Sequence, residues 1–437
     1  MLALAALAAC TAAASAANSI DETVAEQRSL EGRDETAAPT AKTSSGDVRG
    51  HVVEGCRVFR GVPFAEPPVG ALRWRAPVAK APWSGVRAAT KPAAQCPQLD
   101  ILRGEHFGSE DCLYLSVYAP PSCTAESPCA TMFWIYGGAW TIGGNGEFGL
   151  YAGEHLAMQH GVVVIAANYR LDSLGWLALE ELADEATGAY ANYGLQDQRL
   201  AMRWARANAA AFGGDPSRLT IFGESAGAFS VCQHLTSPAS DGLFSRAIME
   251  SGDCDGPWLI QDGHSAKRFG DDYATLVGCP PSATPGERAV CLRRLTPAQV
   301  MEPYSSWLCP KHLPRPDDPW CNSTKGVWRP WPATRPAMAP VAGWTAVVDG
   351  TAEGLLDTPY NLMRRGRINR GPDGKPLQLI MGTNQDEMAL FLASLDLIVP
   401  GVRLPPRRET AAMLVEHIVH YHQHWNGKRA ERFLRSG

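Results

Sequence analysis

The chain has 437 residues, of which 45% are hydrophobic and 19% are charged, and its formal net charge is −5. A chain of this length can bury a large core, and its balance of residue types is that of an ordinary globular protein. The near-neutral charge excludes the basic surface typical of nucleic-acid-binding proteins, and no stretch beyond the N-terminus is apolar for the length that a membrane span needs.

The N-terminal segment differs from the rest of the chain. Residues 1–17 carry no charged side chain, consist mostly of Ala and Leu, and contain an Ala-Ser-Ala sequence near their end. A small–x–small site after an apolar run is typical of a cleaved signal peptide, so we expect residues 1–17 to be removed and the protein to be secreted or extracytoplasmic. A lipid anchor at Cys10 and an Ala-rich disordered tail are the alternatives. Residues 18–45 are polar and predict a flexible lead-in.

Twelve cysteines in a chain with such a leader indicate an oxidising compartment, in which cysteines form disulfides. Close spacing along the sequence favours three local pairs and, more weakly, a fourth: Cys96 with Cys112, Cys279 with Cys291, Cys309 with Cys321, and Cys123 with Cys129. Spacing gives no partner to Cys56, Cys232 or Cys254. The alternative is a cytosolic protein with buried free thiols.

Taken in order, the chain predicts strands that alternate with helices. Apolar or alternating runs predict strands at 48–60, 114–118, 131–136, 161–167, 219–223, 244–252 and 377–381. Helices are predicted over 193–212, directly after Ser225, over 262–300 with an interruption, over 357–365 and over 408–435. Prolines and glycines predict a surface segment over 59–74 and an irregular insertion over 303–343. This alternation predicts a mostly parallel α/β sheet, and we expect a single domain over 46–437.

The most informative stretch is the apolar run from Leu219, which ends in Gly223-Glu-Ser225-Ala-Gly227. Gly-x-Ser-x-Gly between a strand and a helix is the pattern of a nucleophile elbow, in which a strained turn exposes a serine hydroxyl. The positions beside the serine must be nearly free of side chains, and the two glycines meet that need. The helix N-terminus after the serine favours negative charge. We therefore predict Ser225 as a nucleophile.

A second turn offers hydrogen-bond donors to the same site. The strand over 131–136 leads directly into Gly137-Gly138-Ala139, where the backbone can approach a ligand closely. A site of this design takes its oxyanion donors from such a turn and from the residue after the nucleophile, which predicts Gly138, Ala139 and Ala226. The fold fixes the order serine, acid, histidine, and Glu387, at the C-terminal end of the last predicted strand, fits the acid.

Eight segments of the chain resemble type-B carboxylesterases, the cholinesterase-like branch of the α/β-hydrolase fold. In sequence order they are FRGVPFAEPPVGALRW, SEDCLYLSVYAP, WIYGGAW, NYRLDSLGWL, GLQDQRLAMRW, FGGDPSRLTIFGESAGAFSV, LFSRAIMESG and GTNQDE. The resemblance implies an α/β-hydrolase fold with a mostly parallel central sheet flanked by helices. It also implies a serine esterase that acts on a small-molecule carboxylic ester and needs no cofactor or metal.

The resemblance assigns roles to individual residues. It implies Ser225 as nucleophile and Glu387 as acid, Gly138, Ala139 and Ala226 as oxyanion donors, Glu224 and Ser251 packed behind the catalytic groups, Trp258 and Trp140 in the substrate pocket, disulfides Cys96–Cys112 and Cys279–Cys291, and ion pairs of Arg73 with Glu110 and Arg170 with Asp197. Two of these roles have plainer alternatives. Trp258 fits a core position as well as a pocket wall, and Arg170 with Asp197 fits a surface pair worth little.

Three departures from the family pattern stand out near the site. The oxyanion turn reads Gly-Gly-Ala where the family usually has a third glycine, as in a subset of its esterases, and Met388 follows the acid where the family usually has Gly. The loop between Cys96 and Cys112 is short and lacks the tryptophan that stacks on a choline headgroup. A cation–π site needs such an aromatic face, which argues against choline-ester selectivity.

The catalytic histidine is the largest departure. In the family it lies roughly one hundred residues after the acid, in the order that the fold fixes. The candidates here are His417, His420, His422 and His424, which fall in a predicted helix without the family's His-x-x-acid loop. We assign none of them, expect the chain to be truncated before the base, and expect negligible hydrolysis by the chain as given, because a serine without a base is a poor nucleophile. The alternative function is a catalytically inactive, cholinesterase-like binding or adhesion protein.

Overall fold

The computed structural model describes residues 38–100, 105–146, 149–254, 260–280, 285–305 and 344–384, together with the backbone of 321–322 and 327–328. The expected signal peptide and residues 18–37 of the lead-in lie outside these residues. So do Trp258, Glu387, the four C-terminal histidines and most of the insertion over 303–343. What the sequence predicts for them stays a prediction. Residues 40–43 form a strand that pairs with 46–49, so the prediction of a flexible lead-in is wrong there.

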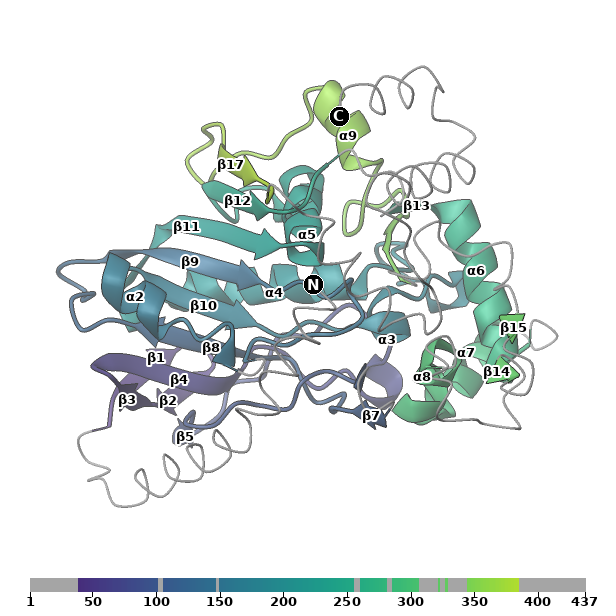
Figure 1. Ribbon diagram of the computed structural model, residues 1–437, viewed down its shortest axis with the longest axis horizontal. Helices are drawn as coiled ribbons and strands as arrows, with labels where there is room; N and C mark the ends of the chain where they lie inside the picture. Colours follow the sequence, from purple (N-terminus) through teal and green to yellow (C-terminus); the bar gives the residue numbers. More distant parts are fainter. Residues whose placement is uncertain are drawn as a thin grey trace, which may run out of the picture.

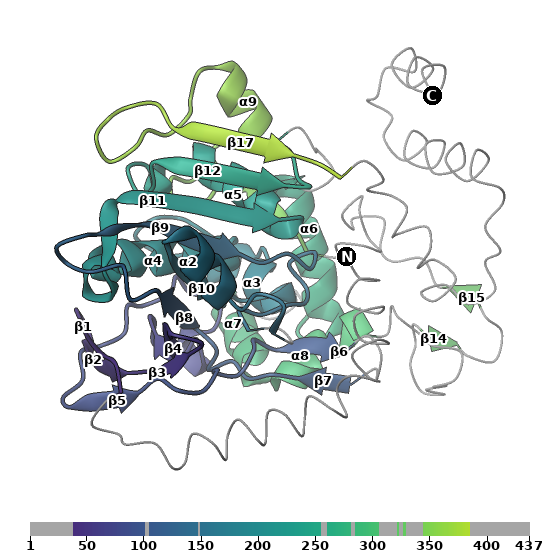
Figure 2. The same cartoon turned by 60° about the vertical axis from the view of Figure 1, so that its left-hand side comes forward.

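A mixed eight-stranded sheet forms the centre of the described part of the chain (Figures 1 and 2). In spatial order its strands are β17 (Gln378–Gly382), β12 (Arg246–Glu250), β11 (Gly214–Glu224), β9 (Cys129–Ile135), β10 (Val163–Ala167), β8 (Tyr114–Ala119), β4 (Cys56–Pro63) and β3 (His51–Val53). Neighbours from β17 to β10 run parallel, whereas those from β10 to β3 run antiparallel. The expected mostly parallel α/β sheet is therefore confirmed.

Burial explains why the central strands are continuous apolar runs. β10 reads VVIAA, and all five of its residues are buried. In Figure 2, α2 (Glu154–His160) covers the near side of the sheet, and α5 (Ala226–Thr236) lies on the far side. A strand with both faces covered has no polar side, so the alternation typical of half-exposed strands is lost.

Apart from α3 (Asp172–Trp176), where no helix is predicted, the remaining helices follow the predicted order. They are α4 (Tyr193–Asn208), α6 (Gly263–Leu276), α7 (Pro285–Arg294), α8 (Pro297–Ser305) and α9 (Pro359–Arg364). α4 continues into a 3-10 turn that ends at Gly213, whose φ of 79° provides the predicted stop. Figure 1 shows α6, α7 and α8 beyond the arrowheads of β9 and β11. This helical layer therefore lies at the carboxyl edge of the parallel strands.

Short strands form small sheets that are separate from the central sheet. β1 (Thr40–Thr43), β2 (Gly46–Arg49) and β5 (Val86–Ala88) form a small sheet, and the two-stranded pairs are β6 (Gln98–Asp100) with β7 (Glu105–Phe107), β13 (Ile260–Asp262) with β16 (Ala346–Val348), and β14 (Cys321–Asn322) with β15 (Val327–Trp328).

The segment over 59–74 differs from the predicted surface segment. Its first residues belong to β4, and the side chains of Phe59, Val62, Phe64 and Trp74 are buried. Proline is compatible with the end of a strand, so Pro63 closes β4 instead of marking an exposed loop. The surface prediction is wrong because the apolar residues between the prolines decide where this segment lies.

Two bidentate ion pairs connect segments that are distant in the sequence. Arg73 contacts Glu110 through Nε–Oε1 and Nη2–Oε2 distances of 2.6 Å each. Arg170 contacts Asp197 through Nε–Oδ2 and Nη2–Oδ1 distances of 2.7 Å each, and the two side chains are 3% and 0% exposed. The alternative of a surface pair at these two residues is therefore wrong. Loss of either partner would leave a buried charge unpaired, so this pair fixes the segment after β10 to α4.

Four disulfides join the described cysteines: Cys96–Cys112, Cys279–Cys291, Cys123–Cys129 and Cys232–Cys254. The first two are those that the resemblance implies, and the third is the weaker local pair. The fourth joins two cysteines to which sequence spacing gave no partner. Cys56 is the only free cysteine of the described ranges and is buried. The pairing of Cys309 with Cys321 is untested, since Cys309 lies outside those ranges.

Candidate active site

Ser225 occupies a sharp turn between β11 and α5. β11 ends at Glu224 and α5 begins at Ala226, so Ser225 alone joins the strand to the helix. Its φ of 53° and ψ of −121° lie where side-chain-bearing residues are rare, at a cost of roughly 1–3 kcal/mol. The Ser225 N–H donates to the Glu250 carbonyl at 2.9 Å, and the Ser225 carbonyl accepts from the Phe229 N–H at 2.9 Å. The surroundings therefore hold a partly buried serine in a strained conformation at a helix N-terminus.

The two glycines of the elbow are required by space. A Cβ on Gly227 would lie 1.9 Å from the Ile135 carbonyl oxygen, and a Cβ on Gly223 would lie 2.7 Å from that same oxygen. Real side chains do not fit at such distances unless the backbone moves. The end of β9, the end of β11 and the start of α5 thus meet at their backbones, which explains the Gly-x-Ser-x-Gly pattern physically.

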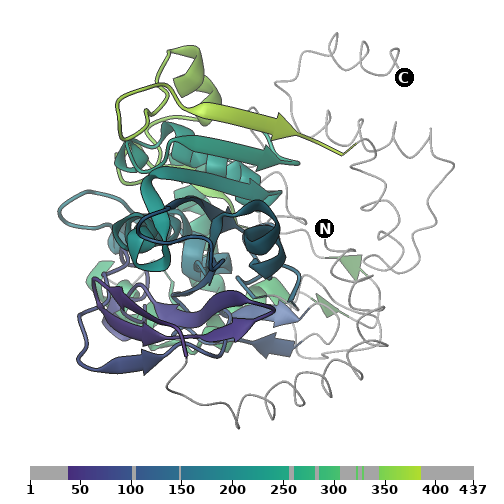
Figure 3. The ribbon, with the colours of Figure 1, turned by 90° about the vertical axis from the view of Figure 1, so that its left-hand side faces the viewer.

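The glycine turn lies at the same edge of the sheet as Ser225. β9 and β11 are parallel, with Ile135 opposite Gly223, so Gly138 follows this register point by three residues and Ser225 follows it by two. Figure 3 shows the arrowheads of the neighbouring strands on one side of the molecule. The register therefore brings the predicted nucleophile and the predicted donor turn to one place.

The turn itself is tightly closed. Gly138 has a φ of 103°, and a Cβ there would lie 2.2 Å from the Ile142 carbonyl oxygen. Its own carbonyl accepts the Ile142 N–H at 3.1 Å, while the φ of Ala139 is 54°. Among the described residues, none accepts a hydrogen bond from the N–H of Gly138, Ala139 or Ala226. Backbone donors without a protein acceptor are what an oxyanion site requires.

Two polar side chains that the sequence analysis did not single out hold this turn. The Gln98 carboxamide donates to the Gly143 carbonyl and accepts the Gly143 N–H, both at 2.8 Å. Ser230, on α5, accepts from the Trp140 indole N–H at 2.9 Å and donates to the Ala226 carbonyl at 3.0 Å. These bonds tie the glycine turn to β6 on one side and to the nucleophile helix on the other. Lone Gln and Ser residues carry no sequence signal that could have found them.

Trp140 is fully buried in this structure. Its ring packs against Trp176 at a centroid distance of 5.4 Å, and its indole N–H is bonded to Ser230. The indole therefore connects the turn to the core and has no exposed surface. The prediction that Trp140 lines the substrate pocket gains no support from this placement, and the same prediction for Trp258 lies outside the described residues.

The third part of the edge is the end of β12 beside the end of β17. The Ser251 N–H donates to the Gly382 carbonyl at 2.7 Å, and the Asn384 amide donates to Ser251 Oγ at 3.4 Å. Ser251 has a φ of 55°, and Glu224, the other residue expected behind the catalytic groups, is partly buried at the end of β11. Glu387 follows five residues after Gly382 and lies outside the described residues, so its role as the acid stays a prediction.

His234 lies on α5 but is not available as a base. Its Nδ1 lies 2.9 Å from Ser240 Oγ, and its Nε2 lies 3.0 Å from Gln198 Oε1. Burial, with a smaller contribution from the nearby Arg199 charge, lowers its pKa well below the ordinary value. A ring whose two nitrogens are both engaged inside the core cannot exchange a proton with Ser225. We therefore assign His234 a structural role.

The model of the carboxylesterase family matches residues 37–433. The chain belongs to the carboxylesterase family. The expected type-B, cholinesterase-like membership and the esterase fold are thereby confirmed.

Several relatives within the family are similar over long stretches. Acetylcholinesterase of Gallus gallus is 41% identical over 282 residues, which cover 60% of this chain and 36% of the relative. Acetylcholinesterase of Electrophorus electricus is 36% identical over 355 residues, which cover 79% of this chain and 49% of the relative. A solved PNB esterase has a TM-score of 0.66 at 29% identity, over 87% of this chain and 69% of that one. The chain thus spans at most about half the length of these two curated relatives.

Three further observations concern membranes, metals and location. No helix of the described ranges has the length and apolar character needed to cross a membrane. Within those ranges, no cluster of His, Cys, Asp and Glu side chains has the arrangement of a metal site. The disulfides, together with the acetylcholinesterase relatives, fit an extracellular protein.

Proposed function

We propose that the protein hydrolyses a carboxylic ester through an acyl-enzyme intermediate on Ser225. The observation that supports this most is the elbow: a strained serine at a helix N-terminus faces the same sheet edge as three backbone N–H groups without a described acceptor. A strained conformation of this kind persists only where its surroundings hold it, and such strain concentrates at functional sites. Membership in the carboxylesterase family supports the same reaction.

In the proposed reaction Ser225 Oγ attacks the ester carbonyl carbon, and the carbonyl oxygen takes up negative charge. The N–H groups of Gly138, Ala139 and Ala226 would donate to that oxygen as the charge develops. The intermediate collapses, the alcohol leaves with a proton, and water then releases the acid from Ser225. Glu387 would orient the base. We assign no histidine to the base, because His234 is engaged in the core and the four C-terminal histidines lack the family's His-x-x-acid loop.

The substrate is proposed at the level of its class. A small-molecule carboxylic ester fits the family, while the short Cys96–Cys112 loop offers no tryptophan for a choline headgroup. We further propose a secreted or extracytoplasmic location, an N-terminal signal peptide over 1–17, and one domain over 46–437. The disulfides support the oxidising compartment that this location implies.

Ester hydrolysis with added imidazole tests the proposal. Imidazole supplies a base from solution, so the test does not depend on which histidine, if any, acts on Ser225. The full chain should release p-nitrophenol from a short-chain p-nitrophenyl ester at a rate that increases with imidazole, above the rate of free imidazole alone. Ser225→Ala should reduce this rate to background. The matched control is Ser217→Ala, which changes an exposed serine on the same β11 strand.

The outcomes separate the two candidate functions. Turnover that persists in Ser225→Ala would contradict the acyl-Ser225 mechanism. A chain without any Ser225-dependent turnover, with or without imidazole, would instead favour the inactive binding or adhesion protein.

A further inference from the structure

The segment Glu250–Cys254, which we call the strap, runs beside the nucleophile helix. It begins at the end of β12, where the Glu250 carbonyl accepts the Ser225 N–H at 2.9 Å. It ends at Cys254, which is disulfide-bonded to Cys232 on α5 with a Cα–Cα distance of 5.6 Å. Ser225 immediately precedes α5 and Cys232 lies seven residues further along it. The strap is therefore attached to this helix at both ends.

The middle of the strap contacts the elbow directly. A Cβ on Gly252 would lie 2.6 Å from the Ala228 Cβ and 3.2 Å from the Ser225 carbonyl oxygen. Only a glycine allows the strap to lie this close to the first turn of α5. The strap thus accepts the Ser225 N–H through Glu250, and at Gly252 it leaves no room for a side chain beside Ala228 and the Ser225 carbonyl.

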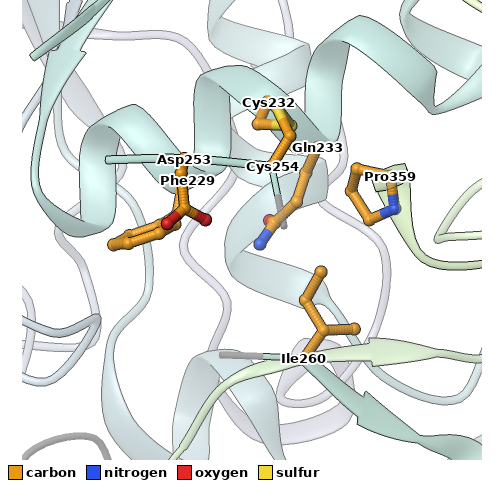
Figure 4. A pocket seen from close by; sticks show the side chains of 7 residues that line it. All are labelled: Phe229, Cys232, Gln233, Asp253, Cys254, Ile260 and Pro359. Carbon is orange, nitrogen blue, oxygen red and sulfur yellow. A yellow bond between two sulfur atoms is a disulfide. The ribbon is translucent and has the colours of Figure 1, made fainter. Parts of the chain in front are cut away.

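The outer end of the strap is only partly enclosed: Asp253 is exposed and Cys254 is half-buried against the core. A small hollow lies between Asp253, Cys254, Phe229 and Ile260, as Figure 4 shows. Gln233 also lines it, is 1% exposed, and has neither a donor nor an acceptor for its carboxamide within the described part of the chain. A strap that borders an unfilled space has few van der Waals contacts on that side. The Cys232–Cys254 disulfide is the covalent connection between this end and α5.

From these contacts we infer that the Cys232–Cys254 disulfide is a positioning element of the esterase site. It holds the strap against α5, and the strap in turn holds Ser225 in its strained conformation. The inference rests on the proposed function for its effect on catalysis. Without the disulfide the outer end of the strap can leave α5, and the elbow can relax toward an ordinary backbone conformation. The serine is then presented correctly for a smaller fraction of the time.

The structure offers a matched control in the Cys123–Cys129 disulfide. Cys129 begins β9 and pairs with Gly214 at the start of β11, so this bond lies at the opposite end of the two strands that carry the site. A bond that only stabilises the fold should act in the same way at either end. A bond that positions Ser225 should act only at the carboxyl edge.

The test compares the full chain with Cys232→Ser/Cys254→Ser and Cys123→Ser/Cys129→Ser, well below their unfolding temperatures. With imidazole added as the base, the strap variant should lose about tenfold or more in kcat for a short-chain p-nitrophenyl ester, with KM changed little, because the serine is correctly presented for a smaller fraction of the time. The control variant should keep both constants. Equal losses of kcat in the two variants, or no loss in the strap variant, would overturn the inference.

A readout without turnover separates this inference from the proposed function. Hydrogen exchange should become faster in residues 225–232 and 250–254 of the strap variant and stay unchanged there in the control. Unchanged hydrogen exchange in the strap variant would overturn the inference, whether or not the wild-type chain is active. An inactive wild-type chain whose strap variant exchanges faster would contradict only the proposed function.

If the strap variant does not fold, Gly252→Ala takes its place, because the added Cβ pushes the strap off α5 while the disulfide remains. The same faster exchange at Ser225 is expected, and its absence would count against the inference.

Discussion

The two edges of the parallel strands differ in which residues occupy the left-handed backbone region. In the turns before β10, β11 and β12, at the amino edge, these positions belong to glycines: Gly161 (φ 62°), Gly213 (φ 79°) and Gly242 (φ 69°). After β9, β10, β11 and β12, at the carboxyl edge, residues with side chains also take them: Ala139 (φ 54°), Trp140 (φ 56°), Asp172 (φ 53°), Ser225 (φ 53°) and Ser251 (φ 55°).

The two edges therefore have different roles: the amino-edge turns connect elements, and the carboxyl-edge turns carry the candidate functional residues. Glycine adopts a positive φ at little cost, so the amino-edge turns simply join one element to the next. A side chain in the same region costs energy and persists only where surrounding contacts hold it. Strain that gathers at one edge, around Ser225, supports the proposal that this edge carries the chemistry. Substitutions at the two edges therefore test whether the backbone strain marks the functional edge.

The largest effect is expected for Gly227→Ala at the carboxyl edge. Its Cβ would lie 1.9 Å from the Ile135 carbonyl oxygen, so β9 or α5 must move. We expect the free energy of unfolding to fall by about 3 kcal/mol or more, and any Ser225-dependent turnover to vanish. Urea unfolding measures the first effect. A loss below about 1 kcal/mol would show that the three backbones at the elbow are less closely packed than described.

A pH-dependent effect is expected for Asp172→Asn. Burial raises the pKa of the Asp172 carboxyl from its usual 3.8 to about 7. Between these values the folded protein binds more protons than the unfolded chain, so this residue's contribution to stability declines as the pH rises from 3.8 to 7 and is constant above. Asparagine does not ionise, so the variant should gain stability over the wild type from pH 5 to pH 8.

We expect this gain to be roughly 2 to 3 kcal/mol, read from urea unfolding at the two pH values. An equal difference between variant and wild type at pH 5 and pH 8 would contradict a buried, protonated carboxyl at this edge.

The smallest effect is expected for Gly161→Ala at the amino edge. No atom lies within 4 Å of a Cβ built on Gly161, so only the positive φ opposes the substitution. The left-handed region costs an alanine roughly 1 kcal/mol. Gly242→Ala, which is also free of close neighbours, is the matched second site, and thermal unfolding measures both. A loss as large as that of Gly227→Ala would remove the contrast between the edges.

The parts of the structure that the sequence predicted best are those whose causes are local. The elbow could be predicted because its own tight turn leaves no space for side chains at positions 223 and 227. The order of strands and helices could be predicted from the apolar runs. The α/β-hydrolase fold was predicted from eight segments that together resemble a known family, and no single residue could have indicated it.

The misses arise from contacts between distant segments. Cys232 and Cys254 are 22 residues apart and bond only because β12 returns the chain to α5. The segment over 59–74 looked exposed because proline and glycine mark turns, although Phe64 and Trp74 pack into the core. The sequence left open that Arg170 and Asp197 form a surface pair, but both side chains are buried in the fold. Burial depends on the whole fold, so local composition could not decide these cases.

Covalent labelling of the nucleophile by an organophosphate is the most direct test of the Ser225 mechanism, because the label forms a phosphoryl ester on the attacking serine. The full chain is treated with an organophosphate ester in the presence of imidazole, digested with trypsin and mapped by mass spectrometry. The account predicts one adduct in the peptide 219–246, assigned to Ser225 by fragmentation and absent from Ser225→Ala. An adduct on another serine, or one that persists in Ser225→Ala, would contradict it.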